Sequence, residues 1–369
     1  MDTAALLVET LRFRGARTPE QLRGAWASAS VRGLERLVVF EQCALWLCQR
    51  LRQCLALSVV SPSFADRLAR AARKDAAQNL RVDEETENTL RVLGEAGIPY
   101  VLLKGAARHA AAALHPYANA RATRDVDVLV PANEADRAWG ALRAAGYDRV
   151  YPDSEPNRSS HHLPPLWTVR RVAVEIHIST SRFLPPQEAW GRALGGARLV
   201  RWGGLNVRVP SPTELFWHSL THAAQEHVLH EGGFRLRYFQ DAAVILAAAD
   251  EIEWEEVARR LGSAEVKDRP TAARWLGAAA ALAGVVLPRG ILGEATPFDL
   301  ERSLRWRLGV LRWVGPWPRL ADQFLAEEVR AELGQPLTPV AVGASALVRG
   351  RHGTAARAAR VCYRLWRAA

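Results

Sequence analysis

The pattern of hydrophobic residues changes twice along the chain, and these changes constrain the fold most strongly. Residues 1–96 have apolar positions three or four apart, and the helical stretch 62–96 ends at Gly97, a residue that often ends helices. Residues 97–212 alternate short β-rich runs with helical ones, and helical periodicity returns over 213–369. The sequence therefore predicts an α+β fold, with a mixed core between two helical regions.

Within the mixed core, strands are expected where β-branched and aromatic residues cluster between turn residues. The expected strands are 100–103, 125–130, 146–151, 166–170, 172–179 and 205–210, and the expected helices are 106–114 and 133–145. Residues 152–165 are polar and rich in proline. A loop of that length inside a compact domain is usually functional or mobile.

Two aspartates, Asp125 and Asp127, open one of the apolar strands. Because alternate side chains of a strand share a face, both carboxylates point away from the valines that face the core. In the strand 172–179, Glu175 and His177 share a face in the same way. If the two strands are neighbours, Glu175 lies beside the aspartate pair.

Three carboxylates on one face of a sheet repel one another unless a cation lies among them. Mg²⁺ prefers carboxylate oxygens and keeps positions open for water and phosphates. We therefore expect two Mg²⁺ ions, with Mn²⁺ as an alternative, at Asp125, Asp127 and Glu175, an arrangement that suits nucleotidyl displacement. A plainer interpretation stays open, in which Arg121 and Arg124 simply neutralise the aspartates.

The segment before the aspartates has a pattern that is typical of phosphate binding. A short strand leads into Lys104 and Gly105, and a helix follows at once. Glycine lets the backbone approach a ligand closely, and the first N–H groups of a helix bind phosphate. Lysine is rare in this chain, at three of the 49 basic residues, so Lys104 stands out beside the aspartates.

Together these motifs resemble the nucleotidyltransferase superfamily that includes DNA polymerase beta, and within it a bacterial family of uncharacterised nucleotidyltransferases. The resemblance covers about residues 60–260 and is strongest over 96–180. It rests on AGIPYVLLKG (96–105), RATRDVDVLVP (121–131), ALRAAGYD (141–148), HHLP (161–164) and VEIHIS (174–179), followed by TELFWHSLTHAAQEH (213–227) and RLRYFQDAAVIL (235–246).

The resemblance implies a polymerase-beta-like catalytic core at 97–212, flanked by an N-terminal helical region (1–96) and a C-terminal helical region (213–369). It implies a transferase that moves a nucleoside monophosphate from a nucleoside triphosphate, such as ATP, to an acceptor and releases pyrophosphate. The acceptor stays open: a small metabolite, a peptide, a protein or tRNA would all fit.

The resemblance also assigns roles to residues. Asp125, Asp127 and Glu175 become the catalytic, metal-binding acids. Lys104 and Gly105 stand where the wider superfamily has Gly-Gly or Gly-Ser against the nucleotide phosphates. The lysine departs from that wider pattern, and so does the spacing of about twenty residues between Gly105 and Asp125.

Arginines and histidines supply further candidates. Arg121 and Arg124 are candidate triphosphate contacts, since arginine binds phosphate bidentately. His161, His162 and His177 are possible substrate contacts or acid–base groups. Exposed loop histidines often have no functional role, so the alternative that His161 and His162 have none stays open.

Two further features have plainer interpretations. His218 and His222 have a spacing that suits zinc on a helix, but no third ligand is evident, which favours structural roles. Asp241 enters an apolar helix, where it either caps the helix or pairs with Arg237 four residues earlier.

The formal charge of +10 fits a partner that bears phosphates. The C-terminal segment has a basic helix face, formed by Arg357, Arg360, Arg364 and Arg367. This face suits RNA or an anionic membrane, and it equally suits a solvated terminal helix that docks by its apolar side.

The remaining features indicate an intracellular protein. Cys43, Cys48 and Cys54 lie in an apolar helical pattern and are expected to be buried thiols in a reducing compartment. The sequence shows no basic leader followed by an apolar run and no long uncharged apolar window, so we expect a cytoplasmic protein without a transmembrane segment.

Two alternatives to the transferase stay open. One is an accessory protein that binds a nucleotide or substrate on the same fold without turnover. The other is an RNA end-modifying enzyme, which the net charge favours. Stabilisation by nucleotide and Mg²⁺ that vanishes in Asp127→Asn would favour the enzyme, and stabilisation that this change leaves unaffected would favour the first alternative. A steep loss of RNA affinity with salt would identify the second.

Overall fold

The computed structural model describes residues 1–14, 17–111, 118–150, 161–227, 235–248, 250–263 and 265–314. The basic C-terminal segment, Cys362 and most of the polar loop lie outside these ranges. Within them, the expected order of a helical region, a mixed core and a second helical region is found.

The N-terminal region consists of helices only. They are α1 (Thr3–Leu11), α2 (Pro19–Ala27), α3 (Leu34–Phe40), α4 (Ala44–Gln53) and α5 (Pro62–Glu95), with a short 3₁₀ turn η1 (Ala56–Ser58) before α5. The cysteines Cys43, Cys48 and Cys54 are all buried among them, which confirms the expectation of core thiols.

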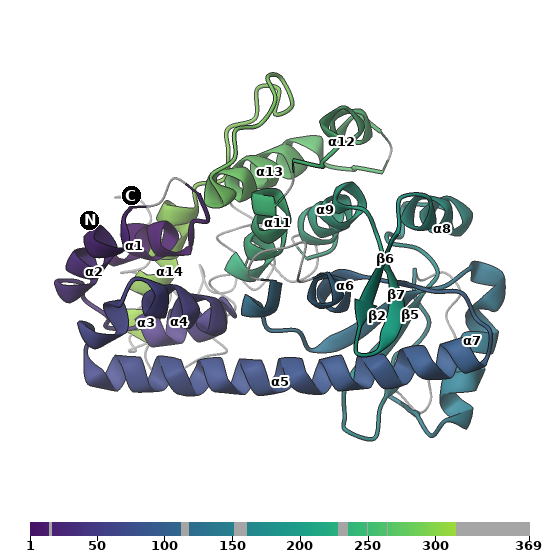
Figure 1. The fold of residues 1–369 in the computed structure, drawn as a ribbon. Coiled ribbons are helices and arrows are strands. Elements are labelled where there is room, and N and C mark those ends of the chain that lie inside the picture. The colour runs from purple at the N-terminus through teal and green to yellow at the C-terminus, as the bar shows by residue number, and fades with distance from the viewer. Residues whose placement is uncertain are drawn as a thin grey trace, which may run out of the picture.

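Helix α5 joins the two halves of the molecule. Its 34 residues correspond to a length of about 50 Å. Pro62 occupies the first position, where a missing N–H does no harm, and Gly97 follows the last turn with a φ of +65° that favours glycine. Figure 1 shows α5 passing under the N-terminal helices and continuing past the sheet. One long element therefore supports both regions.

The central sheet has five strands in the order β1-β2-β5-β4-β3. They are β1 (Val101–Leu102), β2 (Asp125–Leu129), β3 (Asp148–Arg149), β4 (Leu166–Trp167) and β5 (Ala173–His177). Strands β2 and β5 pair in parallel, whereas the other described pairs of this sheet are antiparallel. The two strands that contain the candidate acids are thus direct neighbours at the centre of the sheet.

The other elements of the mixed core cover this sheet or extend from it. They are α6 (Lys104–Ala110), η2 (Ala118–Ala120), η3 (Ala132–Glu134), α7 (Ala135–Ala144), α8 (Pro186–Gly195) and the separate hairpin β6 (Arg198–Trp202) and β7 (Leu205–Val209). Helix α6 begins at Lys104, two residues before the predicted start, and strand β6 was not predicted. The alternation in β6 is weak because none of its residues is fully buried.

The C-terminal region is helical again among the described residues. Its elements are α9 (Pro212–Thr221), the π-helical turn η4 (His222–His227), α11 (Leu236–Ala248), α12 (Trp254–Leu261), α13 (Arg269–Ala283) and α14 (Leu300–Val314). Helix α14 returns to the N-terminal helices and packs on α1, as Figure 1 shows. Helices α9, α11 and α13 pack on one another above the sheet.

One continuous apolar core extends through these regions, from Ala4 to Leu308. It includes the apolar side of the central strands, where Val126, Val128 and Val174 are completely buried. No helix among the described ranges combines the length and the apolar character that crossing a membrane would require.

Candidate functional site

The candidate site is built on the parallel pairing of β2 and β5. In this register Asp127 lies opposite Glu175, and Val126 lies opposite Val174. Because side chains alternate along a strand, the valines enter the core and the two acids meet on the other face. Strands β2 and β5 are therefore neighbours, and Glu175 lies beside Asp127.

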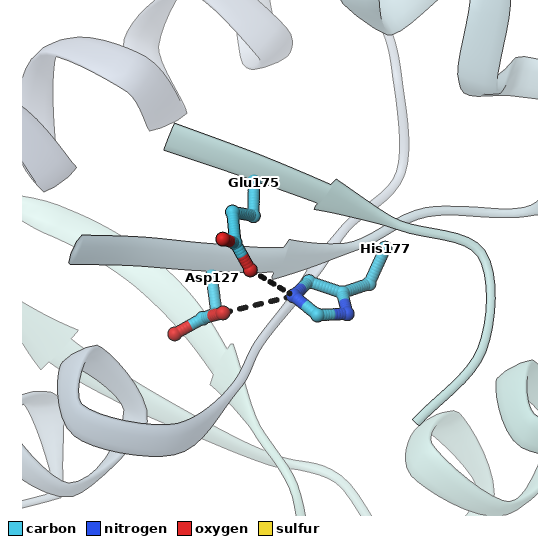
Figure 2. A group of neighbouring side chains, drawn as sticks. All are labelled: Asp127, Glu175 and His177. Carbon is cyan, nitrogen blue, oxygen red and sulfur yellow. Dashed lines mark hydrogen bonds and ion pairs between the residues drawn. The ribbon is translucent and has the colours of Figure 1, made fainter. Parts of the chain in front are cut away.

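Three side chains converge at this point (Figure 2). The ligand atoms of Asp127, Glu175 and His177 all lie within 4.8 Å of one another. His177 Nε2 is 2.8 Å from Asp127 Oδ1 and 3.3 Å from Glu175 Oε2. Two carboxylates and an imidazole at this spacing form a candidate site for a divalent metal ion.

Lys104 reaches the same carboxylates from the start of α6. Its Nζ donates to Asp127 Oδ1 at 2.7 Å and lies 3.8 Å from Glu175 Oε2. The preceding residue is tied to the aspartate strand, because Leu103 N donates to the Asp127 carbonyl at 3.0 Å. Lys104 itself has a φ of +46°, a left-handed conformation that is unfavourable for any residue other than glycine. Strained residues of this kind gather at functional sites.

Asp125 lies at the exposed end of β2 and stands apart from these contacts. It is half-buried, it pairs in register with Ala173, and it is not one of the three convergent ligand residues. We name Asp125, Asp127, Glu175, Lys104 and His177 the acidic cluster.

Burial and mutual charge shift the titration of the acidic cluster. Burial and the neighbouring Asp127 together raise the pKa of Asp125 to about 6, against the lowering effect of Lys104. Burial also opposes ionisation of Asp127, but Lys104 and His177 hold the pKa of Asp127 well below its usual range. The two aspartates therefore differ, because Lys104 and His177 stabilise the charged form of Asp127, whereas the surroundings of Asp125 favour its protonated form.

The basic members of the cluster respond in the opposite sense. Burial alone would lower the pKa of Lys104 and of His177, yet both are raised by the adjacent carboxylates. In turn, the hydrogen bond with His177 lowers the pKa of Glu175 despite its burial. The ionised forms of all three residues are thus mutually stabilised.

A second charged group, which we name the arginine cluster, lies beside the acidic one. It consists of Arg108 on α6, Arg121 before β2, and Asp241 on α11, where Asp241 Oδ1 is 3.0 Å from Arg108 Nη2 and 2.8 Å from Arg121 Nε. The expected pairing of Asp241 with Arg237 is wrong, as is the helix-capping role, because Asp241 lies inside α11 and its ion-pair partners come from the mixed core.

The arginine cluster has an excess of positive charge. Burial and the neighbouring Arg121 together lower the pKa of Arg108 to about 10, against the raising effect of Asp241. The charge of Arg121 acts on Asp125 as well as on Asp241. Arg121 is thus held near the aspartates without an ion pair to either of them among the described contacts. Arg124, the other candidate arginine, is exposed.

Gly105 has a packing role that its sequence context does not reveal. A Cβ atom at this position would lie 2.5 Å from Thr123 Cγ2 and 2.7 Å from Thr123 Oγ1. The space that glycine leaves open is therefore filled by the threonine two residues before Asp125. The glycine sets the distance between α6 and the aspartate strand.

Polar residues of α5 hold the segment that leads into β2. Asn79 Oδ1 accepts a hydrogen bond from Thr123 N at 2.8 Å, and its Nδ2 donates to the Arg121 carbonyl at 2.9 Å. Asp83 Oδ1 is 2.8 Å from His109 Nδ1, and His109 Nε2 is 3.2 Å from Thr123 Oγ1. The sequence motifs did not single out these positioning residues, because Asn79 is one of several polar residues on the buried side of α5.

The candidate histidines gather around the acidic cluster. His162 forms an isolated antiparallel bridge with His177, and the ring centroids of His161 and His162 lie 5.6 and 5.3 Å from that of His177. Burial, aided by His177 and His162, lowers the pKa of His161 to about 2. These two histidines are half-buried along the end of β5, so the alternative of fully exposed loop side chains does not apply.

His218 approaches the site from α9. Burial and the charge of Lys104 hold its pKa well below the usual range. The ring centroid of His222 lies 6.0 Å away, but neither residue belongs to a convergent group of metal ligands among the described residues. His218 is therefore close enough to Lys104 for the ammonium charge to act on it.

Two observations indicate that a divalent cation fits the acidic cluster. Asp127 Oδ2 is buried and has no hydrogen-bond partner among the described residues. Asp125 shares a strand face with Asp127, and burial together with the charge of Asp127 raises the pKa of Asp125 to about 6. Carboxylate oxygens are ligands that hard divalent cations prefer, so the chemistry of these donors matches such an ion.

No curated protein and no solved structure matches the chain. One family model matches residues 27–279, and its description is "Uncharacterised nucleotidyltransferase". This match covers more than half of the chain, including the whole acidic cluster. The chain therefore belongs to this family of uncharacterised nucleotidyltransferases, as its sequence motifs had indicated.

Proposed function

We propose that the protein transfers a nucleoside monophosphate from a nucleoside triphosphate to an acceptor, with Mg²⁺ as cofactor and pyrophosphate as the leaving group. The proposed catalytic unit is a polymerase-beta-like core at residues 97–212, between helical regions at 1–96 and 213–369. ATP is the first triphosphate to test, and the acceptor is a metabolite, a peptide or a protein.

One observation supports this proposal above all others: in a chain of a nucleotidyltransferase family, Asp127 and Glu175 lie side by side on neighbouring parallel strands. Asp125 shares the face of Asp127. We propose that these three carboxylates hold the cations of the reaction. When bound, a divalent ion would supply positive charge to the reacting phosphate and its leaving group. The number of divalent ions depends on Lys104, whose ammonium already contacts the carboxylates.

The proposed reaction is an in-line displacement at the α-phosphorus. A bond forms between the acceptor oxygen and the α-phosphorus, and the bond to the bridging oxygen of pyrophosphate breaks. The acceptor proton passes to a carboxylate, for which Glu175 is the candidate because it is partly open to solvent while Asp127 is fully buried. His177 holds Glu175 in place through their 3.3 Å contact.

The remaining candidates are proposed to position the two substrates. Lys104 and the Gly105 backbone amide would orient the phosphates, and Arg121 and Arg124 would bind the outer part of the triphosphate. The histidines His161 and His162, beside His177, are proposed to contact the acceptor.

The experiment compares two labels. The purified protein is incubated with host-lysate fractions and MgCl₂, once with α-labelled and once with γ-labelled nucleoside triphosphates. We expect the α-label to appear on a component of one fraction, together with released pyrophosphate, and Asp127→Asn to abolish both. Transfer of the γ-label alone would identify a kinase, and no transfer from any triphosphate would contradict the proposal.

A further inference from the structure

The two oxygens of the Asp127 carboxylate have different surroundings. Oδ1 contacts two nitrogen atoms, Lys104 Nζ at 2.7 Å and His177 Nε2 at 2.8 Å. Since a carboxylate oxygen offers about two lone-pair sites, Oδ1 has none left for a further ligand. Oδ2 is also buried but has no hydrogen-bond partner among the described residues.

Lys104 lies where a shared cation would lie, because its Nζ contacts the carboxylates of both Asp127 and Glu175. Its side chain is 18% exposed, and its backbone is anchored by the hydrogen bond from Leu103 N to the Asp127 carbonyl. The backbone at Lys104 is therefore fixed against the aspartate strand, and the ammonium is held by its contacts with the two carboxylates. A divalent ion on the same side of Asp127 would meet a positive charge within a few ångströms, and such repulsion is large in a buried site.

Within the described ranges, the second oxygen of Asp127 and the neighbouring Asp125 lack such partners. Oδ2 is unpartnered, and Asp125, on the same strand face, has no ion-pair partner among the described residues. A buried carboxylate oxygen without a hydrogen-bond partner and a second carboxylate without an ion-pair partner, both on one strand face, favour the binding of a divalent ion.

We infer that Lys104 serves as a built-in cation between Asp127 and Glu175, so that the protein binds one divalent ion, at Asp125 and Asp127 Oδ2, instead of two. This inference rests on the proposed function, which requires positive charge on both sides of the reacting phosphate. The ammonium supplies one unit of charge and three N–H donors, but it cannot ionise the acceptor as a metal does. Proton removal then depends on Glu175.

The test counts bound ions and does not depend on turnover. Full-length protein without nucleotide is titrated with Mn²⁺, and free Mn²⁺ is measured by its electron paramagnetic resonance signal. We expect one tightly bound Mn²⁺ per wild-type chain and two per chain in Lys104→Met, where the position is vacated. Lys104→Arg keeps the charge and should bind one. Lys74→Met is the matched control, since Lys74 is an exposed lysine on α5, and it should also bind one.

Two carboxylate variants test the location even if the Lys104 variants do not fold, which circular dichroism would reveal. Asp125→Asn should weaken Mn²⁺ binding at least tenfold, whereas Glu175→Gln should change it less than threefold. A wild-type count of two or of zero overturns the inference, as does a count of one in a folded Lys104→Met protein or a Glu175→Gln effect larger than that of Asp125→Asn.

The outcomes separate this inference from the proposed function. A wild-type protein that transfers the α-label with two bound ions overturns the inference and leaves the proposed function standing. A protein that binds one Mn²⁺ at Asp125 but transfers no label overturns the proposed function and leaves the ion count intact.

Discussion

The acidic cluster and the arginine cluster each contain fully buried charged groups, and they differ in the sign of their uncompensated charge. The acidic cluster has three carboxylates against one ammonium and one imidazole. The arginine cluster has two guanidinium groups against the single carboxylate of Asp241. An excess of carboxylates favours the binding of a cation, whereas an excess of guanidinium groups favours the binding of an anion. The two neighbouring clusters together therefore favour the binding of a phosphate with its metal ion.

Helix α6 links the two clusters. Lys104 at its start contacts the acids, and Arg108, four residues later and hence on the same side of the helix, contacts Asp241. The charges also act across the boundary, since Arg121 acts on Asp125. Each cluster therefore reduces the charge imbalance of the other, and a change in one is expected to affect both.

The largest expected effect comes from removing the charge of the most contacted acid. Asp127→Asn removes the negative charge that lies closest to Lys104 and His177, and with it a proposed metal ligand. We expect transfer to fall on the order of 10⁴-fold, about 5 kcal/mol of transition-state stabilisation, as when one member of a cooperating catalytic unit is lost. Label transfer per minute is the measurement.

The control for this variant is Asp148→Asn, the same chemical change on strand β3, where the side chain is 78% exposed. It should leave transfer within about twofold, because exposed surface substitutions have small effects. Equal losses in the two variants would show that Asp127 has no special role.

The second prediction concerns stability and addresses the arginine cluster. Asp241→Ala leaves two buried guanidinium groups side by side without a counter-charge. Breaking a buried pair in this way destabilises a protein by roughly 3–5 kcal/mol. Urea denaturation followed by circular dichroism measures the free energy of unfolding.

A rescue variant sharpens that prediction. Arg108→Met in the Asp241→Ala background removes one of the two unpaired charges and should restore part of the stability. Asp250→Ala, at an exposed position just after α11, should change the free energy of unfolding by less than about 0.5 kcal/mol. No rescue by Arg108→Met would show that charge repulsion is not the cause.

The two clusters also differ in how far the sequence predicts them. The faces of Asp127 and Glu175 follow from the period of two in a strand, which is a local property, and the rarity of lysine drew attention to Lys104. The partners of Asp241 come from α6 and from the segment before β2, far away in the sequence. Local helix spacing instead favoured Arg237, because helix rules describe only neighbours within one element.

The same limit applies to glycine. The motif around Gly105 predicts a strand-to-helix turn, and the structure contains one, but the residue that fills the space beside the glycine is Thr123. Only the packing of α6 against the segment before β2 brings them together. Patterns in the sequence thus predict elements and faces well, whereas close contacts between elements depend on the assembled fold.

The third prediction uses that contact to move both clusters at once. Gly105→Ala places a methyl group into Thr123, and overpacking of this kind destabilises a protein by about 1–3 kcal/mol. Since α6 would shift, Mn²⁺ affinity should fall with stability. The matched control is Gly94→Ala on α5, where a Cβ meets nothing within 4 Å, so stability should stay the same or rise slightly.

A double mutant tests whether Thr123 is the obstacle. Thr123→Ala removes the two atoms that approach the added methyl most closely. The pair Gly105→Ala and Thr123→Ala should then lose less stability than the sum of the single variants, by about 1 kcal/mol. Strict additivity would place the strain elsewhere.

The smallest expected effect is a pH dependence that originates from the acidic cluster alone. The pKa of Asp125 is about 6 in the folded protein, above the ordinary value of 3.8, because of burial and the neighbouring Asp127. Between about pH 4 and 6 the folded chain keeps a proton that the unfolded chain has released. The free energy of unfolding therefore falls as pH rises through this window. Asp125→Asn cannot titrate, so its stability relative to wild type should increase by about 1–2 kcal/mol from pH 4 to pH 7.

Adding Mn²⁺ at pH 7 should stabilise the wild type and not the variant, because the ion replaces the missing positive charge at Asp125. A constant difference between the two proteins at all pH values would show that Asp125 is already compensated, and the contrast with the arginine cluster would then be lost.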